Sequence, residues 1–145
     1  IETGIKTAEI HNYVYDSFKE NRLRLLGYIL SQKMVILPEY NAAYISLNKE
    51  DLIKFNVKTG DTEGIVNYPL GIRGIRIAAM ITDRSSEGSN ENEIRLSLRS
   101  IGDISVSEMS NKYFNGGGHK NAAGGMVTTS IEDAIERFKK ALSEI

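Results

Sequence analysis

The chain has 145 residues, enough for one domain with its own core, and its 41% hydrophobic and 26% charged residues are ordinary for a soluble globular protein. Its net charge of -1 argues against a broad, nonspecific nucleic-acid surface, so any nucleic acid bound here should be short and locally gripped. The absence of cysteine excludes disulfides and thiolate metal sites and fits the cytoplasm, and no apolar run approaches the ~18 residues of a membrane span.

The first quarter of the chain predicts helix. Between residues 8 and 33, apolar side chains recur at spacings of three, four and seven, with a break expected at Glu20-Asn21. Because the chain starts at Ile1 rather than Met, we expect residues 1–34 to be linker helices from an absent N-terminal domain, although an ordinary N-terminal core helix fits equally. His11 is expected on the helix surface, since no second ligand accompanies it at metal-binding spacing.

Four strands are predicted in the middle of the chain. Residues 34–37 and 42–47 favour β-structure and predict a hairpin, followed by a short helix over 48–55 whose inward side chains are Leu52, Ile53 and Phe55. Residues 75–82 are apolar on both faces, which suits a central strand, and residues 93–100 alternate cleanly. These two predict a second hairpin.

The alternating strand carries candidate ligands of an anion. Ile94, Leu96 and Leu98 fall on one face, and Arg95, Ser97 and Arg99 fall on the other. A solvated strand face explains the pattern, but the guanidinium fork also suits phosphate. Arg84 is expected at the other end of this hairpin from Arg99, so the two need not share one site.

The last third of the chain predicts a helix, a glycine-rich loop, a strand and a helix. Ser105 and Glu108 have capping-box spacing for a helix over 106–114, and Asn115-Gly116 should end it. A strand over 125–129 and a final helix from Ser130 follow, with an inward stripe that runs to Ile145. The whole order predicts an α/β fold with a mixed sheet flanked by helices.

The stretch GGGHKNAAGG, residues 116–125, carries the most chemistry. Three consecutive glycines are costly to order, and the usual reason for them is a close approach of the backbone to another segment or to a ligand. Exposed amides in such a loop can hold phosphate oxygens, His119 and Lys120 can add positive charge, and Asn121 can donate and accept. A plain turn between helix and strand fits the spacing as well.

This stretch closely resembles the signature near the C-terminus of DHH-family phosphoesterases, in their DHH-associated domain. Residues 61–70, DTEGIVNYPL, look like a segment of the nanoRNase and phosphoadenosine-phosphate phosphatase branch, and residues 97–100, SLRS, look like the strand before the glycine loop. The resemblance covers residues 35–145, as a DHH-associated substrate-binding domain. Three separated motifs in the right order make it specific.

The resemblance implies a metal-dependent phosphoesterase that hydrolyses short oligonucleotides as a 3'-5' exonuclease, 3'-phosphoadenosine 5'-phosphate, or both. Such hydrolysis needs a cluster of ligands for two divalent ions, which the family carries on its N-terminal domain with the Asp-His-His motif. That motif is absent from this sequence. We therefore expect Mn²⁺ or Mg²⁺ on an N-terminal DHH domain in cis, no catalytic or metal-binding residue in this chain, and no activity from it alone.

The resemblance also implies which residues hold the scissile phosphate and the neighbouring nucleotide. These are Arg99, Gly116, Gly117, Gly118, His119 and Asn121, with Arg84, Ser97 and Lys120 as further candidates. Within the glycines, we expect Gly117 and Gly118 to face the ligand and Gly116 to end the helix. The alternative for His119 is a side chain that only caps the glycine turn.

Two other functions stay open. Alanyl-tRNA synthetases carry a similar glycine-motif domain, which would make this chain a non-enzymatic nucleic-acid-binding module; residues 62–70 argue against that. An exopolyphosphatase-related hydrolase would need more Lys and Arg around the groove than the sequence places. A cyclic dinucleotide as substrate and a homodimer as assembly are further alternatives that the sequence does not separate.

Overall fold

The computed structural model describes residues 19–86 and 88–145, so the interpretation of His11 and of the helix before residue 19 lies outside the described residues. The described residues form a six-stranded sheet in the order β1-β2-β3-β4-β6-β5. β2 and β3 are parallel, whereas the other neighbouring pairs are antiparallel. The predicted α/β class with a mixed sheet is confirmed. The strands are β1 (Met34–Leu37), β2 (Ala42–Leu47), β3 (Ile77–Asp83), β4 (Ile94–Ser100), β5 (Gly117–His119) and β6 (Ala122–Val127).

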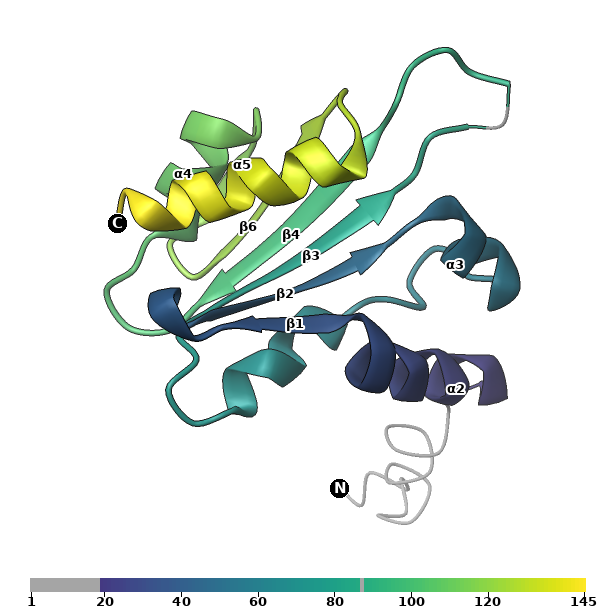
Figure 1. Ribbon diagram of the computed structural model, residues 1–145, viewed down its shortest axis with the longest axis horizontal. Coiled ribbons are helices and arrows are strands. Elements are labelled where there is room, and N and C mark those ends of the chain that lie inside the picture. The colour runs from purple at the N-terminus through teal and green to yellow at the C-terminus, as the bar shows by residue number, and fades with distance from the viewer. Residues whose placement is uncertain (1–18, 87) are drawn as a thin grey trace, which may run out of the picture.

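Helices cover the two faces of this sheet unequally. Figure 1 shows α4 and α5 on one side of the sheet and α2 and α3 on the other. None of the helices in the described part of the chain is long and apolar enough to cross a membrane. The helices are α2 (Glu20–Tyr28), the π-helix η1 (Ile29–Lys33), the 3-10 helices η2 (Pro38–Tyr40) and η3 (Ile65–Gly71), α3 (Lys49–Lys54), α4 (Val106–Tyr113) and α5 (Ile131–Ser143).

Two hydrophobic cores follow from the alternation along the strands. The larger core lies under α4 and α5 and includes Leu96 and Leu98 of β4. The smaller core lies on the opposite face, where Ile45 of β2 and Met80 of β3 pack against α2, η1 and η3. On that second face the side chains of β4 are polar instead, and Arg95 among them is exposed. The second face of β4, β6 and β5 is therefore the open part of the sheet.

The glycine-rich stretch differs from the prediction, because most of it is a β-hairpin. Residues 117–119 form the edge strand β5, and β6 begins at Ala122 rather than at residue 125. The chain leaves α4 at the predicted Asn115-Gly116, but Asn115 rather than Gly116 takes the left-handed conformation, with φ 50°, and the Gly116 amide donates to the Ser110 carbonyl oxygen at 3.2 Å. Two expected core residues, Ile53 and Ile145, are exposed by 69% and 67%.

Close contact with α4 explains this hairpin and its glycines. A Cβ on Gly116 would lie 1.9 Å from the carbonyl oxygen of Gly124, and a Cβ on Gly125 would lie 2.6 Å from Phe114 Cβ. The buried Ser110 hydroxyl donates to the Gly124 carbonyl at 2.6 Å. The end of α4 therefore rests directly on the hairpin backbone, which leaves no room for side chains on that face.

Candidate functional site

The strand register brings Arg99 and His119 onto the same face of the sheet. Residues paired across neighbouring strands carry their side chains side by side. Arg99 of β4 pairs with Ala122 of β6, which pairs in turn with His119 of β5. Two strand spacings place the backbones of Arg99 and His119 about 10 Å apart. Because Ala122 between them is small, both side chains can reach one anion above it.

Two more cross-strand rows lie beside this one on the open face. The next row runs from Ser97 of β4 through Gly124 to Gly117. The row after that pairs Arg95 with Met126. Two arginines and a serine of one strand, predicted from alternation, thus stand on the same open surface as His119.

A hollow of about 540 Å³ adjoins the β4 side of these rows. One wall is β4, and the facing wall is the turn at residues 59–64, which includes the start of the DTEGIVNYPL motif. The Arg22 guanidinium of α2 supports that turn by donating to the carbonyl oxygens of Gly60 at 3.3 Å and Glu63 at 2.8 Å. The cationic and hydroxyl groups that line the hollow come from Arg84, Arg95, Arg99, Ser86, Ser97, Thr59, Thr62 and Thr82.

Arg84 and Arg99 both line this hollow, although they come from opposite ends of the β3–β4 hairpin. From the sequence, Arg84 and Arg99 did not need to share one site. In the structure, the turn at residues 59–64 lies across from β4, and both arginines line the hollow between them. Arg95 is paired with Glu93 at 2.6 Å, and Arg99 donates to the Leu98 carbonyl at 2.9 Å. The hollow is lined by three guanidiniums and by only two carboxylates, those of Glu63 and Glu93, so its net charge is positive and favours an anionic ligand.

Two predicted residues lie away from this face. The Asn121 side-chain amide donates to Ser100 Oγ at 2.9 Å and to the carbonyl oxygens of Gly102 and Ile104, so it holds the connection between β4 and α4. Lys120 faces the opposite hollow, where its Nζ lies 3.4 Å from Asp103 Oδ1. The structure therefore does not bring these two side chains to Arg99 and His119.

The three consecutive glycines have different surroundings. Gly116 and Gly118 are required by the fold, because a Cβ on either would collide with the backbone of the hairpin, and Gly118 has φ +146°. A Cβ on Gly117 would meet nothing within 4 Å. Only Gly117 of the expected ligand-facing pair therefore presents an open surface on the face of Arg99 and His119.

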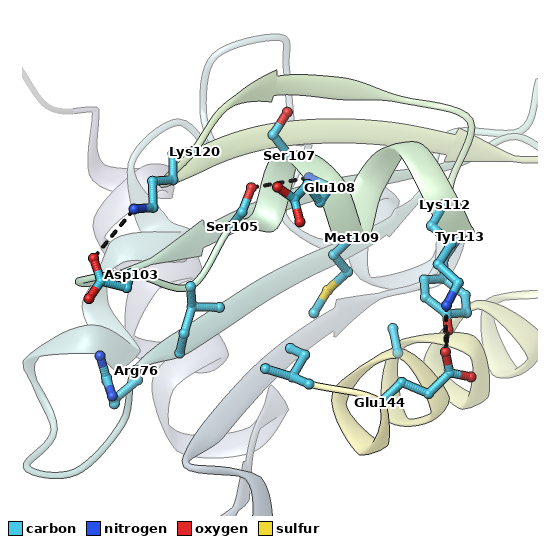
Figure 2. A pocket seen from close by; sticks show the side chains of 13 residues that line it. Arg76, Asp103, Ser105, Ser107, Glu108, Met109, Lys112, Tyr113, Lys120 and Glu144 are labelled. Carbon is cyan, nitrogen blue, oxygen red and sulfur yellow. Dashed lines mark hydrogen bonds and ion pairs between the residues drawn. The ribbon is translucent and has the colours of Figure 1, made fainter.

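A larger hollow, of about 1040 Å³, lies on the opposite face beside α4 and α5. Figure 2 shows two ion pairs around it, Lys112 with Glu144 and Lys120 with Asp103. Lys112 binds Glu144 at 2.7 Å, and the Tyr113 hydroxyl also donates to that carboxylate. The Glu144 carboxylate raises the pKa of Lys112, and Lys112 lowers the pKa of Glu144. Since its charges are compensated, this hollow is a weaker candidate for an anionic ligand.

The described residues do not fit a metal centre. Nowhere in residues 19–86 or 88–145 do three or more His, Cys, Asp or Glu side chains gather as a metal site requires. These described residues therefore offer no ligand set for a divalent ion. Its open face is suited to binding an anion and to stabilising charge on it.

Arg95 and Met126 also lie on this surface, but they were not among the expected site residues. The alternation of β4 already placed Arg95 beside Arg99. Met126, which is 43% exposed and lies in the row of Arg95, could be assigned to this face only from the register of β4 with β6.

Comparison with known proteins identifies the family. The model of the DHHA1 domain matches residues 39–145. The bifunctional oligoribonuclease and PAP phosphatase NrnA of Bacillus subtilis is 29% identical over 88% of this chain and 37% of its own length. A 3',5'-cyclic-nucleotide phosphodiesterase of Helicobacter pylori is 29% identical over 94% of this chain and 43% of its own length. The chain thus spans less than half of these relatives.

Solved structures share the fold. An exopolyphosphatase-related protein from Bacteroides fragilis superposes with a TM-score of 0.86 at 40% identity, over 97% of this chain and 39% of that one. The pGpG-specific phosphodiesterase PggH of Vibrio cholerae superposes with a TM-score of 0.61 at 16% identity, over 97% of this chain and 42% of that one.

Proposed function

The chain belongs to the DHHA1 domain family, and from this premise we propose that it is the substrate-binding part of a phosphoesterase acting on short oligonucleotides or small nucleotides. The observation that carries the proposal is the row of Arg99, Ala122 and His119 on the open face, beside a hollow lined by three arginines. We propose 3'-phosphoadenosine 5'-phosphate and short RNA as the substrates, because NrnA is named for both activities.

The site residues have distinct roles in this proposal. Arg99 holds the scissile phosphate through its guanidinium fork, which matches the geometry of phosphate oxygens. His119 donates a hydrogen bond to the same group from the other side of Ala122. Preorganised donors of this kind stabilise the charge that builds on the phosphoryl oxygens during hydrolysis. Ser97 and Arg84 hold the neighbouring part of the ligand.

We propose that hydrolysis needs two divalent ions, Mn²⁺ or Mg²⁺, supplied by a DHH domain of the same longer protein. The chain covers only 37% and 43% of two curated relatives, which leaves room for such a domain in proteins of that length. This chain alone should then bind nucleotide without turning it over. With manganese it should release no product from oligoribonucleotides, whereas a parent protein that contains the DHH domain should do so.

A second candidate is the hydrolysis of polyphosphate. It is favoured by the similarity to the exopolyphosphatase-related protein, at 40% identity over 97% of this chain. Three arginines along one hollow would also suit a chain of phosphates. Isothermal titration of this chain with an adenosine dinucleotide, a mononucleotide, tripolyphosphate and a tRNA separates the candidates.

Preference for the dinucleotide or mononucleotide supports the proposed function. Preference for tripolyphosphate supports the second candidate, and binding of tRNA alone supports a non-enzymatic module. Product release by the purified chain with manganese, above a control without protein, would contradict the assignment of catalysis to another domain.

A further inference from the structure

A row of one serine and two glycines crosses the open face between two rows that carry larger side chains. This glycine track consists of Ser97, Gly124 and Gly117, which form one cross-strand row. Above Gly117 a Cβ would meet nothing within 4 Å, and at Gly124 the nearest atom would be the Leu96 carbonyl oxygen at 3.4 Å. Gly117 also lacks the positive φ that makes its neighbour Gly118 depend on glycine. The fold therefore does not require glycine at position 117.

The two rows that flank the glycine track differ in chemistry. On one side stand Arg99 and His119, which suit an anion. On the other side stand Met126, a large apolar side chain that is 43% exposed, and its register partner Arg95, whose guanidinium is bound to the Glu93 carboxylate at 2.6 Å. The thioether of methionine makes favourable contacts with aromatic rings, about 5 Å from sulfur to ring. A nucleobase offers such a ring, whereas a polyphosphate does not.

The spacing of the two rows matches a ligand that has both a phosphate group and a nucleobase. Side chains on one face repeat every two residues, so the row of Met126 lies about 13 Å along the strands from the row of Arg99. One phosphate cannot lie close to both rows' backbones, but a phosphate, its sugar and its base can bridge them. Between the rows, Gly117 and Gly124 expose their backbone, on which the sugar and phosphate can lie without meeting side chains.

We infer that the glycine track receives the nucleotide attached to the phosphate at Arg99 and His119, and that Met126 contacts its base. Met126 is then a specificity-determining residue that favours nucleotides over polyphosphate. The inference rests on the proposed function, because it takes the phosphate position at Arg99 and His119 from it.

Nuclear magnetic resonance of the chain with ¹³C-labelled methionine methyl groups tests this directly. The sequence contains four methionines, and Met109 in the core under α4 and α5 is an internal control. A 5'-phosphorylated adenosine dinucleotide should shift the Met126 methyl signal through the ring current of the base. Tripolyphosphate should leave that signal in place, and neither ligand should move the Met109 signal.

The backbone amide signals of Arg99 and His119 distinguish a failure of this inference from a failure of the proposed function. If they shift with the dinucleotide while the Met126 methyl does not, the inference is overturned and the proposed function survives. If tripolyphosphate moves the Met126 methyl as much as the dinucleotide does, its role in selecting a base is also overturned. If none of these signals responds to either ligand, the proposed function and the inference fall together.

The binding affinities of variants test the same contact between the nucleotide and the glycine track. Met126→Ala should weaken dinucleotide binding about 2- to 10-fold, the range of a sulfur–aromatic contact, and should leave tripolyphosphate binding unchanged. Met126→Leu should retain part of the affinity, and Ile145→Ala, which truncates an even more exposed apolar side chain on the opposite face, should retain all of it. Gly117→Ala should weaken dinucleotide binding while the melting temperature stays constant. Unchanged dinucleotide affinity in both Met126→Ala and Gly117→Ala would contradict a ligand on the track.

Discussion

Ser110 and Gly116 are in such close contact that a single added methyl group on the glycine would lie 2.5 Å from the serine hydroxyl oxygen. Ser110 is fully buried in α4, and its hydroxyl donates to the Gly124 carbonyl of β6. This contact shows why the glycine-rich motif serves the fold as well as the ligand. One side of the motif is packed against α4, and the other side carries His119 on the open face.

Alanine variants of Gly116, Gly117 and Gly118 should differ in their free energies of unfolding. Gly118→Ala should lower the free energy of unfolding by about 1–3 kcal/mol, because alanine is strained at its φ and its Cβ meets the Ala122 carbonyl oxygen at 2.6 Å. Gly116→Ala should be at least as damaging, since its Cβ collides with backbone. Gly117→Ala should be neutral or slightly stabilising. Chemical denaturation of the three variants checks this order, and equal losses in all three would contradict it.

The Ser110 hydroxyl should contribute to stability through the carbonyl that it satisfies. Ser110→Ala leaves the Gly124 carbonyl without this buried donor, and we expect a loss of about 1–3 kcal/mol. Ser107→Ala is the matched control, because it removes a similar hydrogen bond to the Gly118 carbonyl at a more exposed position. The thermal unfolding of the two variants should differ, with the larger loss in Ser110→Ala. The reverse order would show that α4 is not fixed to the hairpin through Ser110.

Asp51 should make part of the stability depend on pH. Its buried carboxylate accepts hydrogen bonds from Tyr28 at 2.6 Å, Lys33 at 2.8 Å and the Asn48 amide at 3.0 Å. Burial alone would raise the pKa of Asp51, but the bonds from Lys33, Tyr28 and Asn48 outweigh it and hold the pKa below its ordinary value of 3.8. The folded state therefore disfavours the proton, and this stabilisation is present above pH 3.8 and lost as the pH falls through the folded pKa.

Asp51→Asn should accordingly be destabilised near pH 7, by about 1–3 kcal/mol, and the gap to the parent should close in acid. Asp133→Asn is the control, because its exposed pair with Arg137 contributes little. Urea denaturation between pH 2.5 and 7 measures both. A gap for Asp51→Asn that stays constant across this range would show that the carboxylate charge is not the source of the stability.

Elements with a strong side-chain signal could be predicted from the sequence. The hairpin of β3 with β4 followed from apolar alternation. The predicted cap at Ser105 accepts a hydrogen bond from the Glu108 amide, and the last helix begins after Ser130 as predicted. Local chemistry sets these features, because the side chains involved are neighbours in the chain. Their prediction therefore needed no knowledge of the tertiary structure.

The hairpin of β5 with β6 could not be predicted in this way. Its residues are mostly Gly and Ala, which are depleted in strands, so no propensity marks it. It forms because α4 packs on its backbone, which is a tertiary contact. The shared hollow of Arg84 and Arg99 depends on another such contact, the turn at residues 59–64 over β4. The candidate residues could be named from the sequence, but their grouping required the register and these contacts.

The central claim is that Arg99 and His119 hold one phosphate on the open face, and isothermal titration calorimetry with an adenosine dinucleotide tests it most directly. Arg99→Ala and His119→Ala should each lose about 1.5–3 kcal/mol of binding free energy, the range of hydrogen bonds to a charged group, with almost no change in melting temperature. Arg137→Ala, which removes a guanidinium from α5 on the opposite face, should bind as the parent does. The double variant should lose less than the sum of the two single losses, because both residues contact the same anion. Parent-like affinity in Arg99→Ala and His119→Ala, with a clear fall in melting temperature, would contradict the claim and assign both residues to the fold.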